Sequence, residues 1–223
     1  MKKDLTLIIP AKNEAVSLPI VLKELIKYKF NKIIILDKND KETINAINKF
    51  KCKIIKQKKQ GYGAAIIEGI QNSKTKYVCI FNADGSFDPK YISIMLNKVQ
   101  KKYDFVFASR YMSRSKSYDD TLLTYLGNKI FSYIGNIFFK IKLSDILYTY
   151  ILGNRNKFIK LKLKSNDFRL CPEIPIKIKR NGFSYTSINN VERKRIGDKK
   201  KVNEIIDGGL ILFFMITEYF KIK

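Results

Sequence analysis

The sequence predicts an α/β fold built on a mostly parallel, doubly wound sheet with helices on both faces. Over the first 110 residues, short apolar runs rich in β-branched residues alternate with longer amphipathic stretches. The chain has 223 residues, of which 45% are hydrophobic, and that is enough to bury one sizeable core. Polar and glycine-containing motifs follow the apolar runs, at the positions where such sheets bind ligands.

Each predicted strand is a short apolar run bounded by polar or turn-forming residues. In chain order, the predicted strands span residues 5–9, 32–36, 52–55, 77–81 and 105–108. The predicted helices have apolar residues at helical spacing and span residues 15–28, 42–50, 63–71 and 90–99. Because strand and helix alternate strictly, neighbouring strands are expected to run parallel to one another.

No internal repeat or low-complexity linker divides the chain, so a single domain over residues 1–223 is predicted. The N-terminal apolar run is too short for the core of a signal peptide and is predicted to be the first strand. No stretch reaches about 20 continuous apolar residues, so no transmembrane helix is predicted. The apolar segment GLILFFMI at 209–216 is predicted to be a core helix or a helix at a membrane interface.

The chain carries 44 Lys and Arg against 20 Asp and Glu, a formal net charge of +24. Such an excess favours anionic partners, namely nucleic acid, acidic lipid headgroups or phosphorylated substrates. Most of the basic residues are Lys, so a codon bias that leaves Lys on a solvated surface is an alternative explanation. The few Arg, all from residue 110 onward, are more informative because a guanidinium offers a planar fork to phosphate.

The chain contains no His, which excludes His general bases, Ser-His-Asp triads and His-bearing zinc sites. Any bound metal ion would therefore be held mainly by oxygen ligands. The three Cys, Cys52, Cys79 and Cys171, are far apart and lie in apolar surroundings, so no disulfide framework or redox pair is predicted. A reducing cytosol fits this pattern best.

Four motifs with polar or glycine residues are expected at the carboxyl-terminal edge of the sheet. They are PAKNE at 10–14, DKND at 37–40, GYGAA at 61–65 and NADGSFDP at 82–89. In a parallel sheet such loops converge on one crevice, so their acidic side chains would lie close together. Carboxylate oxygens there suit a hard divalent ion that bridges a diphosphate. The order and spacing of the four motifs carry more weight than any one of them.

In this order, the motifs resemble the family 2 glycosyltransferases of the GT-A fold, which is Rossmann-like. Within that family the chain is similar to the dolichyl-phosphate and polyprenyl-phosphate sugar synthases. The segments that carry the resemblance are IIPAKNE, GYGAAIIEGI, FNADGSFDP, FASRYM at 107–112, GNKIFSYIGNIFFKIKLSD at 127–145 and RIGDKKKVNEIIDG at 195–208. The resemblance implies a nucleotide-sugar-binding half at 1–112. It also implies an acceptor-facing and membrane-facing half at 113–223, with a basic loop and a closing apolar helix.

The resemblance assigns donor-binding roles to single residues. The residues implied to bind the nucleotide donor are Pro10, Asn13, Glu14, Asp37, Gly63 and Asn82. Among them, Asp37 would accept hydrogen bonds from the base or ribose, and Gly63 would let the backbone approach the nucleotide. Asn82 stands where the metal-binding loop of this family commonly begins with Asp.

The resemblance also implies catalytic and phosphate-binding residues. The residues implied to act in catalysis are Asp84, Asp145 and Arg195. Asp84 would hold Mg²⁺ or Mn²⁺ on the donor diphosphate, and Asp145 would lie near the reacting centre. The residues implied to hold phosphate charge are Arg110, Arg195 and Lys200. Lys201, by contrast, is predicted to be solvated.

The implied function is transfer of a sugar from a nucleotide-sugar donor to a polyprenyl phosphate. The protein would be cytoplasmic and would bind the inner face of an anionic membrane peripherally through its second half. One alternative is a glycosyltransferase that acts on a saccharide hydroxyl in cell-surface polysaccharide synthesis, with Asp145 as the base. Another is a nucleotidyltransferase, although the first loop is not the Gly-rich, basic loop that such enzymes use. No nucleic-acid partner is expected, because no recognition helix or stacking motif is found.

Some of these residues have structural alternatives, which the sequence leaves open. Asp88 before Pro89 is typical of a helix N-cap followed by a first-turn proline. Asp40 is typical of a turn. The basic residues at 193–201 are also compatible with a solvated loop, and Glu173 is interpreted as a helix-start carboxylate.

Overall fold

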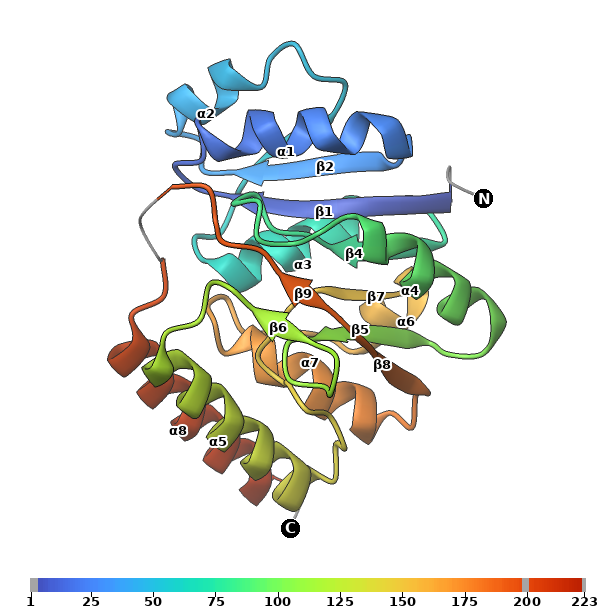
Figure 1. The fold of residues 1–223 in the computed structure, drawn as a ribbon, viewed down its shortest axis with the longest axis vertical. Coiled ribbons are helices and arrows are strands. Elements are labelled where there is room, and N and C mark those ends of the chain that lie inside the picture. The colour runs from blue at the N-terminus through green and yellow to red at the C-terminus, as the bar shows by residue number, and fades with distance from the viewer. Residues whose placement is uncertain (1–3, 198–200, 222–223) are drawn as a thin grey trace.

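The computed structural model describes residues 4–197 and 201–221 and shows, within them, a seven-stranded sheet covered by helices on both faces (Figure 1). Across the sheet the strands follow the order β3 (Lys53–Lys56), β2 (Asn31–Leu36), β1 (Leu5–Ala11), β4 (Tyr77–Ile80), β7 (Ile151–Asn154), β5 (Phe105–Ser109) and β8 (Tyr185–Asn189). Strand β7 runs antiparallel to β4 and β5, and the other neighbouring pairs are parallel. The predicted mostly parallel α/β sheet is confirmed.

Two groups of helices cover the two faces of the sheet. One face carries α1 (Ser17–Leu25), α2 (Lys41–Ala46) and α4 (Lys90–Lys101). The other face carries α3 (Tyr62–Asn72), α5 (Leu122–Phe139), α6 (Arg155–Lys160), α7 (Leu170–Arg180) and α8 (Glu204–Phe220). In β1, Leu7 and Ile9 join the first core cluster and Ile8 joins the second, as expected when successive side chains point to opposite faces. Because both faces are covered, β1 is buried along its whole length.

All the strands and helices predicted for the first 110 residues form, with ends shifted by a few residues. The main departure is β7, which comes from the second half of the chain yet lies between β4 and β5. Residues 1–112 and 113–223 therefore contribute to one sheet. Gly153 permits this insertion, because a Cβ atom added there would lie 2.4 Å from the ring of Phe105.

Two features bring residues 113–223 to the carboxyl-terminal edge of the sheet. The short strands β6 (Lys116–Ser117) and β9 (Val191–Glu192) pair in parallel, which joins the segment after β5 to the basic loop after β9. Helices α5 and α8 pack against each other at one end of the molecule (Figure 1). The predicted helical segment 209–216 lies inside α8. Its residues Ile211 and Met215 are buried in the core, whereas Phe213 is exposed.

None of the helices in the described part of the chain combines the length and hydrophobicity that a bilayer-crossing segment needs.

Candidate active site

A pocket of about 1060 Å³ opens at the carboxyl-terminal edge of the sheet. Its floor comes from the loops after β1, β2 and β4, which place Glu14, Asp37 and Asp84 in its lining. Its far wall comes from the first turns of α5 and α8, including Thr124 and Asp207. The position agrees with the rule that doubly wound sheets bind ligands beyond the carboxyl ends of their strands.

The loop after β1 is held in place by the start of α2. Asn13 adopts a left-handed backbone conformation with φ of 54°, and its amide donates to Asp40 Oδ2 at 2.7 Å. The Glu14 amide donates to Thr43 Oγ1 at 2.9 Å. Asp40 also caps α2 by accepting from the Thr43 amide, so the interpretation of Asp40 as a turn residue is confirmed. The predicted donor-binding residues Pro10, Asn13, Glu14 and Asp37 all line the pocket.

Gly63 differs from its predicted role. It does not line the pocket, and a Cβ atom added to it would lie 2.3 Å from the carbonyl oxygen of Ser165. Gly63 is therefore required because the backbone of residues 165–167 approaches it closely, and not because a nucleotide does. Glu173, at the start of α7, holds this segment by accepting from the amides of Lys164 and Ser165 at 2.8 Å each. The interpretation of Glu173 as a carboxylate at a helix start is confirmed. Glu173 does not line the pocket itself, but its carboxylate holds the segment that leads to the pocket residues Asp167 and Phe168.

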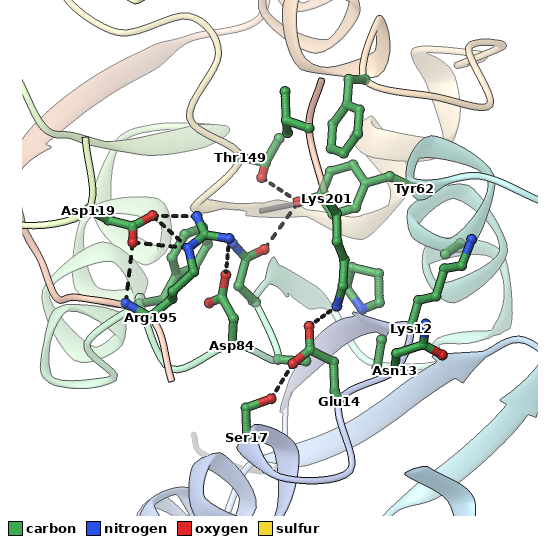
Figure 2. Close-up of a pocket in the computed structure, with 18 of the residues that line it drawn as sticks. Lys12, Asn13, Glu14, Ser17, Tyr62, Asp84, Asp119, Thr149, Arg195 and Lys201 are labelled. Atoms are coloured by element: carbon green, nitrogen blue, oxygen red, sulfur yellow. Dashed lines mark hydrogen bonds and ion pairs between the residues drawn. The ribbon is translucent and has the colours of Figure 1, made fainter. Parts of the chain in front are cut away.

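The loop after β4 presents one open carboxylate oxygen to the pocket. Asp84 Oδ1 accepts from the amide of Ser86 at 3.0 Å and from its hydroxyl at 2.7 Å. Asp84 Oδ2 lies 3.9 Å from Nη1 of Arg195 (Figure 2). Asn82 Oδ1 accepts from the Tyr62 hydroxyl at 3.2 Å, which turns this oxygen toward α3. Asp84 is thus the carboxylate that this loop offers to a ligand.

The residues around Asp84 fit a divalent cation that is shared with a diphosphate. In the described residues, no group of three or more His, Cys, Asp or Glu could enclose a metal ion. Magnesium in nucleotide sites is usually bound by one or two carboxylates together with substrate phosphates, so a full protein cage is not required. Asp84 Oδ2 supplies such a single oxygen.

Arg110 sits at the base of the pocket in a cluster of carboxylates. Its Nε lies 2.8 Å from Asp145 Oδ2, and its Nη1 lies 3.3 Å from Asp120 and 3.7 Å from Glu192. Its guanidinium also lies over the ring of Tyr148, 4.6 Å from the centroid. A buried guanidinium requires such paired carboxylates, because an unpaired buried charge is costly.

Asp145 therefore does not occupy its predicted place near the reacting centre. Its side chain is fully buried, does not line the pocket, and binds Arg110 through both carboxylate oxygens. It acts as the counter-ion beneath Arg110. Arg110 itself lines the pocket as predicted, but its guanidinium is already paired with Asp145 and Asp120.

The basic loop after β9 reaches into the pocket. Arg195 binds Asp119, and Lys201 forms an ion pair with Glu14 (Figure 2). Lys201 is exposed, as predicted, but its ammonium group also reaches the loop after β1 to pair with Glu14. Arg193 lies outside the pocket and binds Glu24 through both carboxylate oxygens at 3.0 Å. These ion pairs contradict a purely solvated loop, and Lys200 lies outside the described residues.

Several pocket residues were not predicted from the sequence, namely Tyr62, Asp119, Asp120, Thr149 and Glu192. The Tyr62 hydroxyl lies 2.6 Å from Thr149 Oγ1, and its ring stacks on Phe168 (Figure 2). The consecutive carboxylates of Asp119 and Asp120 were the one visible signal among these residues. Asp119 pairs with Arg195, which is distant in sequence, and Asp120 pairs with Arg110, ten residues before it.

Burial raises the pKa of Glu192 to about 7, against the opposing attraction of Arg110. When the pKa of a carboxyl group is higher in the folded state than in the unfolded state, the group lowers the free energy of unfolding. This loss develops as the pH rises from the unfolded-state pKa to the folded-state pKa. Glu192→Gln removes that cost. We therefore expect the variant to gain roughly 1 to 3 kcal/mol over the wild type at pH 8, and almost nothing at pH 4. Urea unfolding at both pH values measures this, and a difference independent of pH would contradict it.

Comparison with known proteins identifies the family of this chain. Residues 6–162 match the family model described as glycosyl transferase family 2. The chain is 24% identical to the glycosyltransferase AglJ of Haloferax volcanii, over 91% of this chain and 67% of that protein. It is 25% identical to an uncharacterized protein of Methanocaldococcus jannaschii, over 97% of this chain and 93% of that protein.

Solved structures share the fold at low sequence identity. Mannosyl-3-phosphoglycerate synthase from Rubrobacter xylanophilus has a TM-score of 0.77 at 13% identity, covering 98% of this chain and 74% of that chain. Glucosyl-3-phosphoglycerate synthase from Mycobacterium tuberculosis has a TM-score of 0.74 at 10% identity, covering 97% of this chain and 78% of that chain. These likenesses confirm the predicted GT-A fold. Since the family model also matches more than half of its length, this chain belongs to glycosyl transferase family 2.

Proposed function

We propose that this protein transfers a sugar from a nucleotide-sugar donor to a polyprenyl phosphate at the cytoplasmic face of a membrane. The observation that carries the proposal is that an open carboxylate oxygen, on Asp84, and the guanidinium of Arg195 line the same pocket at the carboxyl-terminal edge of the sheet. Together they provide a cation site and a phosphate-binding group in one pocket.

The donor lies along the loops after β1, β2 and β4 in this proposal. Asp37 would accept hydrogen bonds from the base or ribose, and Asp84 would hold Mg²⁺ or Mn²⁺ on the diphosphate. The structural relative from Mycobacterium tuberculosis was solved with Mn²⁺, uridine diphosphate and phosphoglyceric acid, which supports a donor of this kind. When bound, the metal ion would neutralise charge on the departing diphosphate. Arg195 would bind the phosphate of the acceptor.

A phosphate acceptor suits the groups that line this pocket. The acceptor oxygen attacks the anomeric carbon of the sugar, and the bond from that carbon to the diphosphate breaks. A phosphate monoester has a second pKa of about 6, so it is largely ionised at pH 7 and needs no strong base. A hydroxyl acceptor would need a base, and Asp145 is withdrawn from the pocket as the counter-ion of Arg110. This observation argues against a hydroxyl acceptor that is activated by Asp145.

An exposed apolar surface beside the pocket supports a lipid-linked acceptor. We call it the α5–α8 face, and the exposed large side chains of these two helices are Leu122, Leu123, Tyr125, Leu126, Ile130, Tyr133, Ile137, Phe138, Ile205, Ile206, Leu210, Leu212, Phe213, Ile216 and Phe220. Helices α5 and α8 pack against each other, and soluble proteins rarely expose large apolar patches without a binding role. A second cavity, lined by Leu123 and Ile205, shares Val202 and Glu204 with the main pocket. The apolar surface therefore continues to the edge of the pocket.

Membrane binding through the α5–α8 face can be tested with vesicles. The wild type is expected to co-sediment with anionic liposomes at low salt, and high salt should weaken that binding. The variant Ile205→Ser, Phe213→Ser should bind at least about tenfold more weakly, because each apolar side chain contributes about 1.5 to 3 kcal/mol when buried. The control Ile26→Ser, Ile94→Ser removes two exposed apolar residues away from the α5–α8 face, one on α4 and one beside α1. Equal losses in both variants, or no binding by the wild type, would contradict this prediction.

The acceptor is identified by a transfer assay with labelled nucleotide sugars. The expected result is a sugar-labelled polyprenyl phosphate together with free nucleoside diphosphate. Labelling of 3-phosphoglycerate alone would indicate a water-soluble phosphate acceptor, and labelling of a saccharide would indicate a hydroxyl acceptor. Release of pyrophosphate from an added nucleoside triphosphate, with a sugar phosphate as co-substrate and a nucleotide sugar as product, would indicate a nucleotidyltransferase. Each of these three outcomes would overturn the proposed acceptor.

A further inference from the structure

We propose that Asp119 is a positioning residue that holds the Arg195 guanidinium away from Asp84. It thereby keeps the second oxygen of Asp84 available to a divalent cation. This inference rests on the proposed function, because it assumes that Asp84 binds the metal ion of the donor.

The contacts of Arg195 are strongly unequal. Its Nε lies 3.0 Å from Asp119 Oδ1 and 3.1 Å from Asp119 Oδ2, and its Nη2 also binds Oδ2. The same guanidinium approaches Asp84 Oδ2 only to 3.9 Å, through Nη1. Figure 2 shows Arg195 between the two carboxylates, with its bonded side turned to Asp119. A planar guanidinium that is engaged along one edge by Asp119 cannot turn that edge to Asp84.

The backbone brings Arg195 close to Asp84 whatever its side chain does. The amide of Ile196, the next residue, donates to the Asp84 carbonyl oxygen at 2.7 Å. Gly85, the residue after Asp84, packs against Ile196 so closely that an added Cβ atom would lie 2.6 Å from Ile196 Cδ1. Because the two loops are tied together here, only the direction of the guanidinium decides whether Arg195 pairs with Asp84.

Asp119 itself is presented on a firmly built turn. Ser117 Oγ accepts from the amides of Asp119 and Asp120 at 3.3 and 3.1 Å, and the Ser117 hydroxyl donates to Glu192. Strand pairing between β6 and β9 places this turn beside the basic loop. The exposed fractions of the Asp119, Arg195 and Asp84 side chains are 11%, 22% and 16%, so their attractions are only partly screened by water. Without the Asp119 charge, Asp84 becomes the nearest carboxylate to Arg195.

The test is a double-mutant cycle on Mn²⁺ binding, read from the electron paramagnetic resonance signal of free Mn²⁺ in the presence of uridine or guanosine diphosphate. Asp119→Asn should weaken Mn²⁺ binding by about fivefold to tenfold, as expected for coupled groups in one ion-pair network. In the Arg195→Gln background the same Asp119→Asn change should alter Mn²⁺ binding by less than about twofold. This loss of effect is the signature of positioning, because the competing guanidinium is then absent.

The matched control is Glu24→Gln, which disrupts the two-oxygen ion pair of Arg193 in the same basic loop but outside the pocket. It should leave Mn²⁺ binding unchanged. Equal weakening by Asp119→Asn in both backgrounds would overturn the inference, because Asp119 would then act through its own charge or as a ligand. Weakening by Glu24→Gln to the same extent would overturn it in favour of simple loop anchoring. No Mn²⁺ binding by the wild type would overturn the metal site of the proposed function, and this inference with it.

Discussion

Asp84→Ala is expected to lower kcat for sugar transfer by at least about a hundredfold while the protein stays folded. Asp84 supplies the open carboxylate oxygen of the loop after β4, and its carboxylate lies in the pocket rather than in either core cluster. Its loss therefore removes the cation site without removing core packing. Turnover of a labelled nucleotide sugar, measured with saturating Mn²⁺, gives the effect. The circular dichroism spectrum and thermal midpoint verify the fold.

Asp88→Ala is the matched control for this prediction. Asp88 belongs to the same loop, but its carboxylate accepts from the amide of Lys90 at 2.9 Å and does not line the pocket. Its truncation should cost about 1 kcal/mol of stability, as for other residues that bind a helix-start amide, and should spare kcat. The assignment of the metal site to Asp84 fails if Asp84→Ala keeps near-normal turnover, or if Asp88→Ala loses as much.

Arg195→Lys is expected to lower transfer to the acceptor by roughly tenfold to a hundredfold, with a much smaller change in the affinity for nucleoside diphosphate. The substitution keeps the charge but removes the planar fork that binds two oxygens at once. The hydrogen bond to Asp119 holds the pKa of Arg195 above its usual value, against the opposing effect of burial, so the group is charged throughout the working pH range. Steady-state kinetics with varied acceptor, together with calorimetric titration of the nucleotide, separate the two effects.

Lys194→Ala is the charge control for Arg195→Lys. Lys194 is exposed, adjoins Arg195 in the same loop and does not line the pocket. If the loop acted only by general electrostatic attraction, loss of this charge would slow transfer more than the charge-preserving change at Arg195. That result, or full activity in Arg195→Lys, would contradict a shaped phosphate site.

The strands and helices that could be predicted from the sequence are those whose hydrophobic pattern is visible within a single short segment. Strands β1, β2, β4 and β5 are covered on both faces, so they appear as continuous apolar runs. Strand β7 has only four residues, ILGN, and β8 reads YTSIN, so neither has a recognisable pattern. The insertion of β7 between β4 and β5 depends on sheet pairing between distant segments, which no local pattern reveals.

The same limit applies to the candidate site. Glu14, Asp37 and Asp84 could be predicted because they directly follow strands of a parallel sheet. Asp119 and Glu192 could not, because each is defined by an arginine partner from another part of the chain. Motif position indicated that Asp145 was important. It could not show that Arg110 would cover its carboxylate and remove it from the pocket.

The central claim is that this pocket binds a nucleotide sugar together with a divalent cation held by Asp84. The most direct measurement is the thermal midpoint of the wild type across a panel of nucleotide sugars, each with Mn²⁺ or with EDTA. The claim predicts that at least one nucleotide sugar raises the midpoint by several degrees with Mn²⁺, as expected for a ligand well above its dissociation constant. The increase should disappear with EDTA and in Asp84→Ala. An increase that persists unchanged in Asp84→Ala, or no increase with any nucleotide sugar, would contradict the claim.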